Sequence, residues 1–169
     1  GAGHNLNVAG SSVVGDNRVS LAAGNNLSIG TLTESNRETH LKQEKKSGLM
    51  SSGGVGFSVG SQSLKVTDAA TDTTQKGSTV GSVHGDVSLQ AGNRLTVNGS
   101  DLIAGRDMVM KLDGDLFNSG KLAGKQTVQL SVENIHNQAG TIQGANVSLT
   151  ARTDINSTGG LLQATDSLL

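Results

Sequence analysis

Apolar and polar residues alternate over many short stretches of this chain, and each stretch is bounded by Gly, Asn or Asp. The alternating apolar pairs are Leu6 and Val8, Val19 and Leu21, Leu27 and Ile29, Val87 and Leu89, Leu95 and Val97, Met108 and Met110, Val128 and Leu130, and Val147 and Leu149. A period of two with one apolar side predicts half-buried β-strands. The stretches are shorter than about 5–6 residues, the usual strand length in globular sheets. They are typical of the narrow faces of a β-helix.

The same pattern recurs at a fixed step in the C-terminal half. Large aliphatic residues lie 20 positions apart at Leu102, Leu122, Ile142 and Leu162. Glycines keep this step at Gly120, Gly140 and Gly160, and a small residue follows each aliphatic one at Ala104, Gly124, Gly144 and Ala164. A repeat of this length indicates a solenoid, in which each coil stacks on the one before. We therefore predict an all-β fold, a right-handed parallel β-helix with coils of about 20 residues, forming one domain over residues 1–169.

Four coils are expected at 92–111, 112–131, 132–151 and 152–169. Residues 2–22 resemble 91–111, so coils are also expected before the interruption described next. Stacked strands lie about 4.8 Å apart and bond backbone to backbone, so like residues should form ladders. We expect Phe117 to point into the second of the four coils, and Asn98 and Asn118 to stack at a turn.

Residues 31–83 interrupt the coils. Residues 34–46 are highly charged and carry Leu41 as their one apolar residue, so a helix there would have no face to dock. A solvated hairpin is the preferred interpretation, with a helix supported by Glu38 and Lys42 as the alternative. Val55, Phe57 and Val59 then alternate like a strand, and the Thr-rich residues 67–77 are a plausible partner for the charged segment.

Composition narrows the classes of protein that fit. The 169 residues include 24 Gly and two Phe, with no Pro, Cys, Trp or Tyr, and the net charge is -1. Near-neutral charge argues against nucleic acid as a partner, because phosphate binding needs a basic surface. Without Cys there are no disulfides or thiolate metal sites, and no apolar run approaches the roughly 20 residues of a membrane helix. The chain starts at Gly1 without a visible signal peptide, so we expect a fragment of a longer protein.

The interruption and its flanks resemble a known repeat family. The resemblance is carried by Lys45-Lys46-Ser47-Gly48-Leu49-Met50, by Gly53-Gly54-Val55-Gly56-Phe57-Ser58-Val59-Gly60 and by Gly77-Ser78-Thr79-Val80-Gly81-Ser82-Val83-His84-Gly85-Asp86. With the Ala-Gly-x-x-Leu coils at Ala23 and Ala91, these runs resemble the second filamentous-haemagglutinin repeat region of CdiA-type contact-dependent growth inhibition toxins. From about Leu112 onward the sequence is more similar to the first haemagglutinin repeat type, with its Asn-x-x-Gly and Ile-x-Gly spacing.

The resemblance implies a very large exoprotein that two-partner secretion exports through a dedicated outer-membrane transporter. The protein would be secreted and displayed on the cell surface of a Gram-negative bacterium. Its β-helix would be a stalk that presents a receptor-binding region and ends in a toxin delivered to a neighbouring cell. The second repeat region is implicated in passing the toxin through the target's outer membrane, so that membrane or its proteins would be a further partner. Unpaired end coils would also allow end-to-end self-association.

No cluster of residues predicts catalysis, a metal site or a cofactor. The histidines are scattered, without the spacing of metal ligands, at His4, His40, His84 and His136. Glycan-degrading β-helices need carboxylates that converge on one face. The candidates are Asp101, Asp107, Asp113 and Asp115. The last two flank a glycine like turn residues, and no aromatic platform for a sugar accompanies them. We expect no enzymatic activity, and a carbohydrate-active β-helix is kept as an alternative.

The interruption holds the candidate interaction site, which consists of Leu49, Met50, Val55, Phe57 and Val59. Two interpretations stay open. The segment is either a surface loop that the stalk tolerates, or an amphipathic hairpin that engages a partner or membrane interface through these apolar residues. For the whole chain we predict a structural stalk segment, with an adhesin-type module that recognises a cell-surface ligand as the alternative.

Overall fold

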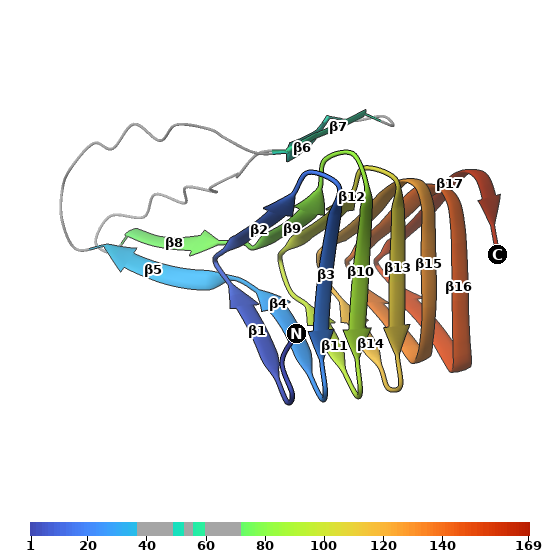
Figure 1. Ribbon diagram of the computed structural model, residues 1–169, viewed down its shortest axis with the longest axis horizontal. Helices are drawn as coiled ribbons and strands as arrows, with labels where there is room; N and C mark the ends of the chain where they lie inside the picture. The colour runs from blue at the N-terminus through green and yellow to red at the C-terminus, as the bar shows by residue number, and fades with distance from the viewer. Residues whose placement is uncertain (37–48, 53–55, 60–71) are drawn as a thin grey trace.

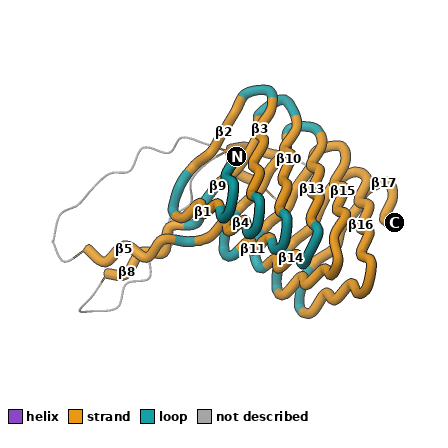
Figure 2. The backbone as a smooth tube through the Cα atoms, turned by 60° about the horizontal axis from the view of Figure 1, so that its bottom comes forward, coloured by secondary structure: helices purple, strands orange, loops and turns teal. Residues whose placement is uncertain are grey.

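The computed structural model describes residues 1–36, 49–52, 56–59 and 72–169. Within these residues the chain forms strands and turns, and it contains no helix long and apolar enough to cross a membrane. One 13-stranded sheet winds into a solenoid whose coils lie side by side (Figures 1 and 2). Two further sheets of two strands each lie outside it.

The solenoid has three faces, each built from parallel strands of successive coils. The first face contains β3 (Arg18–Ala23), β10 (Asp86–Ala91) and β13 (Asp107–Leu112). The second contains β1 (Leu6–Ala9), β4 (Leu27–Gly30), β11 (Leu95–Val97) and β14 (Leu116–Asn118). The third contains β2 (Ser12–Gly15), β9 (Thr79–Ser82) and β12 (Asp101–Ala104). β15 (Lys121–Gln138) and β16 (Thr141–Thr158) pass through all three faces, and β17 (Leu161–Leu168) through the third and the first.

Strict register between coils builds the hydrophobic core. One position of the third face is occupied in turn by Val13, Val80, Leu102, Leu122, Ile142 and Leu162. The predicted 20-residue ladder is therefore confirmed, and it continues across the interruption to Val80 and Val13. Val80, Leu102, Leu122 and Ile142 are each 0% exposed. Burying one such side chain contributes about 1.5–3 kcal/mol, so the stacked aliphatic columns stabilise the parallel β-helix predicted from the sequence.

Phe117 does not point inward, and that part of the prediction was wrong. In β14 the buried residues are Leu116 and Asn118, and Phe117 between them is half-buried on the outer surface. Stacking between coils decides which residues of β14 point inward, because Leu95, Leu116 and Ile135 share one register position and fill one column of the core. Outside, the Phe117 ring stacks on the His136 imidazole with centroids 4.6 Å apart. The Arg94 guanidinium lies over the same ring at 4.9 Å.

An asparagine ladder replaces the aliphatic column at one position of the second face. Val8, Ile29 and Val97 occupy this position in the N-terminal coils, and Asn118, Asn137 and Ser157 occupy it in the later coils. Asn118 Nδ2 donates to Asn137 Oδ1 at 2.8 Å, and Asn137 Nδ2 donates to Ser157 Oγ at 3.1 Å. Both asparagines are buried, so these bonds offset the cost of removing their amides from water. The predicted partner of Asn118 was wrong, because Asn98 is exposed and accepts a bond from Ser119 instead.

Two of the glycines that recur every 20 residues, Gly140 and Gly160, make room for this ladder. A Cβ added at Gly140 would lie 2.5 Å from Asn137 Oδ1 and closer still to Asn118 Nδ2. At Gly160 the added Cβ would meet the Asn137 side chain and backbone, and at Gly120 it would meet the Ser100 carbonyl. At Gly140 and Gly160 the asparagine side chains therefore occupy the space that the missing Cβ of the glycine leaves.

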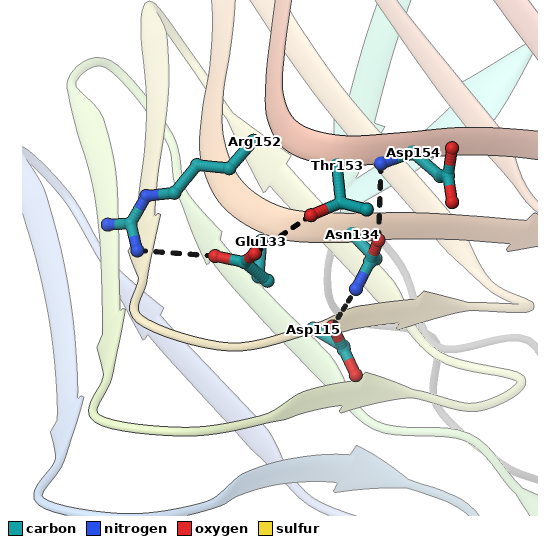
Figure 3. A network of polar contacts seen from close by, with 6 residues as sticks. All are labelled: Asp115, Glu133, Asn134, Arg152, Thr153 and Asp154. Carbon is teal, nitrogen blue, oxygen red and sulfur yellow. Dashed lines mark hydrogen bonds and ion pairs between the residues drawn. The ribbon is translucent and has the colours of Figure 1, made fainter.

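Polar side chains join successive coils at the corner between the first and second faces (Figure 3). Asn134 Nδ2 donates to Asp115 Oδ1 at 2.7 Å, and the Asp154 backbone N–H donates to Asn134 Oδ1 at 3.1 Å. Beside them, Glu133 accepts bonds from Arg152 and Thr153. The corner thus continues the coil-to-coil pairing where β15 and β16 shift register between Val132 and Asn134.

Replacing Gly140 with Ala should destabilise the solenoid, because the added methyl group collides with the buried amides of Asn118 and Asn137. Overpacking of this kind costs about 1–3 kcal/mol. Thermal unfolding followed by circular dichroism measures the effect. Gly30→Ala is the matched control, since nothing lies within 4 Å of a Cβ at that position. Equal stability of the two variants would contradict the proposed coupling of the two columns.

Candidate interaction site on the inserted segment

The interruption is an insertion into a single corner of the solenoid. In the coils on either side, the corner from the second to the third face contains a Gly-Ser pair, Gly10-Ser11 in one and Gly99-Ser100 in the other. In the interrupted coil, β4 ends at Gly30 and the corresponding pair is Gly77-Ser78. Residues 31–76 are called the insert below. They separate Gly30 from Gly77, whose equivalents are adjacent in the other coils, as Ala9 and Gly10 are. The solenoid resumes at Ser78, earlier than the expected residue 83, because β9 is stacked between β2 and β12.

Ser78 closes the corner beneath the insert. Its side chain is buried, and its Oγ donates to the Gly30 carbonyl at 2.6 Å, with the Val8 carbonyl also within bonding distance at 3.2 Å. The same oxygen accepts from the Ser11 N–H at 3.3 Å, and the Ser78 N–H donates to Ser100 Oγ at 3.1 Å. The two ends of the insert are thus held together by a buried hydroxyl that belongs to the core. Sequence reasoning missed Ser78, although the recurring Gly-Ser pair marked the position.

The insert leaves the solenoid as an antiparallel ribbon (Figures 1 and 2). β5 (Leu32–Asn36) pairs with β8 (Asp72–Lys76), from Leu32 opposite Lys76 to Asn36 opposite Asp72. The predicted pairing of the Thr-rich stretch with the start of the charged segment is confirmed over these residues. The helical alternative falls largely on residues 37–46, which lie outside the described residues.

A second ribbon carries four of the five predicted site residues. β6 (Leu49–Ser52) and β7 (Gly56–Val59) are antiparallel, with Leu49 opposite Val59 and Ser51 opposite Phe57. Met50 lies on β6 between these two pairs, and Val55 lies outside the described residues. The backbone register therefore brings Leu49, Met50, Phe57 and Val59 together on one hairpin.

The other candidate residues are dispersed over the solenoid. Asp101 and Asp107 lie on the third and first faces, and Asp115 is bound by Asn134 at a corner. Burial raises the pKa of Asp101, and the stacked Lys121 partly opposes this. His84 pairs with Asp16 at 2.9 Å, and no group of His, Asp or Glu within the described ranges has the geometry of a metal site. Asp101, Asp107 and Asp115 therefore do not lie together on one face of the solenoid.

Comparison with known proteins assigns the repeated coils to a protein family. A family model described as hemagglutinin repeat matches residues 2–119. The chain belongs to this family. The match covers the insert and the coils around it, and it ends beside Asn118, where the core column changes from aliphatic residues to asparagine.

Relatives of the chain carry CdiA names. The chain is 48% identical over 106 residues to a deoxyribonuclease CdiA of Yersinia pseudotuberculosis. The aligned residues cover 63% of this chain and 10% of that protein. It is 44% identical over 123 residues to a tRNA nuclease CdiA of Escherichia coli, covering 70% of this chain and 4% of that protein. A tRNA nuclease CdiA of Burkholderia pseudomallei is 44% identical over 108 residues, covering 64% and 8%. The chain thus spans a tenth or less of these relatives and has the character of a CdiA-like haemagglutinin-repeat region, as the sequence predicted. No solved structure matches it.

Replacing Ser78 with Ala should destabilise the whole solenoid. The change leaves the Ser11 N–H and the Gly30 carbonyl without the hydroxyl that bonds them, and an unsatisfied buried polar group costs about 1–3 kcal/mol. We expect the midpoint of thermal unfolding to fall by several degrees. Ser131→Ala, at an exposed position of the first face, is the control. If both variants melt with the wild type, Ser78 does not hold the corner.

Proposed function

We propose that this chain is a stalk segment of a large CdiA-type exoprotein, which presents and helps to deliver a C-terminal toxin to neighbouring bacteria. The exoprotein would leave a Gram-negative cell through a two-partner secretion transporter and stay on its surface. The observation that carries the proposal is the coil-to-coil register, which is kept between the coils on either side of the insert and across the change of core column. The nuclease names of the relatives refer to proteins at least ten times as long as the matched segment.

The geometry suits a spacer. Each coil contacts only its neighbours, so length is gained by adding coils, at about 4.8 Å each, without a change in cross-section. The fold is held by backbone ladders, aliphatic columns and asparagine bonds, and it contains no Cys. Such a stalk does not depend on the redox state of its surroundings. The open backbone edges of the end coils would allow isolated chains to associate end to end.

Within this role, the insert engages the outer membrane of the target cell. Support comes from the placement of the apolar residues Leu49, Met50, Phe57 and Val59 on a ribbon separate from the solenoid sheet. Val55 belongs to the same proposed contact by sequence. Beneath the insert, the corner of the solenoid is closed by the buried Ser78 hydroxyl, which bonds to the Gly30 carbonyl.

Binding to outer-membrane vesicles of Escherichia coli tests the membrane contact. The wild-type chain should co-sediment with the vesicles, and a variant with Phe57→Asp and Val59→Asp should not, because charged groups do not enter an apolar interface. Val83→Asp with Val109→Asp is the matched control, since both valines are exposed on the solenoid, at 40% each.

Circular dichroism verifies that all three proteins keep the same β-structure. Equal sedimentation of the two double variants would contradict a membrane contact through Phe57 and Val59. Loss of β-structure in the Phe57 and Val59 variant alone would show that these residues are part of the core.

A further inference from the structure

We propose that the outer side of the third face is a docking surface for the β6–β7 hairpin of the insert. The surface consists of Gly81, Ile103 and Ala123, which share one register position on β9, β12 and β15. Docking does not depend on the membrane contact proposed above. It concerns where the hairpin lies when no membrane is present.

Ile103 and Ala123 point away from the core of the solenoid. Their neighbours Leu102, Ala104 and Leu122 all belong to the core. Successive side chains of a strand point to opposite sides of the sheet. The alternation therefore places Ile103 and Ala123 on the outer surface of the third face, where an uncovered side chain meets water.

These outward residues are nevertheless buried. Ile103 is 1% exposed and Ala123 is 0% exposed. The stacked neighbours of Ile103 are too small to cover it, because Gly81 has no side chain and Ala123 has only a methyl group. Val109 points outward from the first face between Met108 and Met110 of the core, and it is 40% exposed. The outer side of the third face is therefore covered by another part of the chain.

The cover extends over the middle of the third face. The same column begins at Val14, which is 46% exposed, and it continues past Ala123 to the partly exposed Gln143 and the exposed Gln163. The buried positions at Gly81, Ile103 and Ala123 thus lie on three successive coils. At about 4.8 Å a coil they span roughly 10 Å. A ribbon of two strands, which also lie about 4.8 Å apart, fits this width.

The β6–β7 hairpin has the composition that such a cover requires. Four of the eight residues in β6 and β7 are apolar, namely Leu49, Met50, Phe57 and Val59. The other ribbon of the insert, β5 with β8, is polar except for Leu32. Apolar residues on the hairpin and an apolar column on the solenoid would be removed from water together by docking.

The insert is anchored beside the surface that the hairpin would cover. It rejoins the solenoid at Gly77, and β9 of the third face begins at Thr79. The 17 residues between Val59 and Gly77 are more than long enough to span the roughly 10 Å across the covered coils. Figure 1 draws the hairpin close to β2, β9 and β12, and not beyond the far end of the β5–β8 ribbon.

Docking keeps the apolar residues of the hairpin against the stalk. The same residues cannot contact the solenoid and a membrane together, so the membrane contact proposed above requires the hairpin to leave the third face. The docked contact is small beside the core columns, and closing the loop of the insert costs conformational entropy. The stability of the solenoid therefore does not depend on docking.

Thiol labelling tests the docking, because the chain contains no Cys and an introduced thiol is the only one present. Ala123→Cys places the thiol on the covered surface. A maleimide should label it slowly in the otherwise wild-type chain. Labelling should be at least tenfold faster when Phe57→Asp and Val59→Asp are added, because charged groups do not pack on an apolar surface. Leu32→Asp, at a 46% exposed position of the other ribbon, is the matched control and should leave the rate unchanged.

Two reference thiols verify that the solenoid stays closed. Val109→Cys, on the outer side of the first face, should be labelled rapidly in every background. Ala104→Cys, in the core, should be labelled slowly in every background. If Ala104→Cys shows that the two Asp substitutions open the solenoid, the milder pair Phe57→Ser and Val59→Ser takes their place, with the same expected result at Ala123→Cys.

Rapid labelling of Ala123→Cys in the otherwise wild-type chain would overturn the proposal, since the third face would then be open. Slow labelling that persists in the Phe57 and Val59 variants would overturn it as well. If deletion of residues 31–76 alone accelerates the reaction, another part of the insert covers the third face. The measurements contain no vesicles, so a failure of the membrane contact would leave their result unchanged.

Discussion

Everything in this fold depends on each coil meeting the next in the same register. A parallel ladder places residue upon residue, so a side chain in one coil packs first against its equivalents above and below. Aliphatic residues at such a position form a dry column, as Val80, Leu102, Leu122 and Ile142 do. A polar residue there must find its hydrogen bonds within the column. Asn118 and Asn137 satisfy this condition by bonding along the ladder, and Gly140 and Gly160 provide the space for their side chains.

The corners between strands are free of this constraint, and the coils differ from one another in the lengths of their corners. Between strands a residue can be gained or lost without shifting the columns, provided that the anchors on both sides stay in register. The corner of Ser119 and Gly120 is one residue shorter than its neighbours, and the corner after Gly30 accepts the whole insert. Ser78 shows what such an insertion needs, namely a buried group that joins the two ends of the interrupted coil. Insertions are therefore accommodated at a corner, because the faces are committed to stacking.

The sequence predicted the columns well and the corners poorly, for one physical reason. The residues of a stacked column recur at a fixed spacing, so the column can be recognised from the sequence alone, as for Leu102, Leu122, Ile142 and Leu162. The prediction that Phe117 points into the core was wrong, because the coils on either side decide which residues of a strand point inward, and here they align Leu116 with Leu95 and Ile135. Asn98 and Asn118 are 20 residues apart, yet the coils between them do not have equal length, so Asn118 meets Val97 instead. The resemblance carried by residues 45–60 and 77–86 identified the family. Spacing alone could not have done so, and the pairing of Leu49 with Val59 depends on a hairpin register that the sequence does not encode as a repeat.

The most direct measurement is thermal unfolding, with far-ultraviolet circular dichroism, of a variant that lacks residues 31–76. In this variant Gly30 is followed by Gly77-Ser78, which reproduces the order of Ala9-Gly10-Ser11 in the coil before. Gly77 can adopt the positive φ that Gly10 shows, because it has no Cβ. We expect this variant to show the β-sheet spectrum of the intact solenoid and an unfolding midpoint equal to or above that of the full chain. Loss of the β-sheet signal, or a separate early unfolding of the N-terminal coils, would show that the insert is part of the solenoid and would contradict the account.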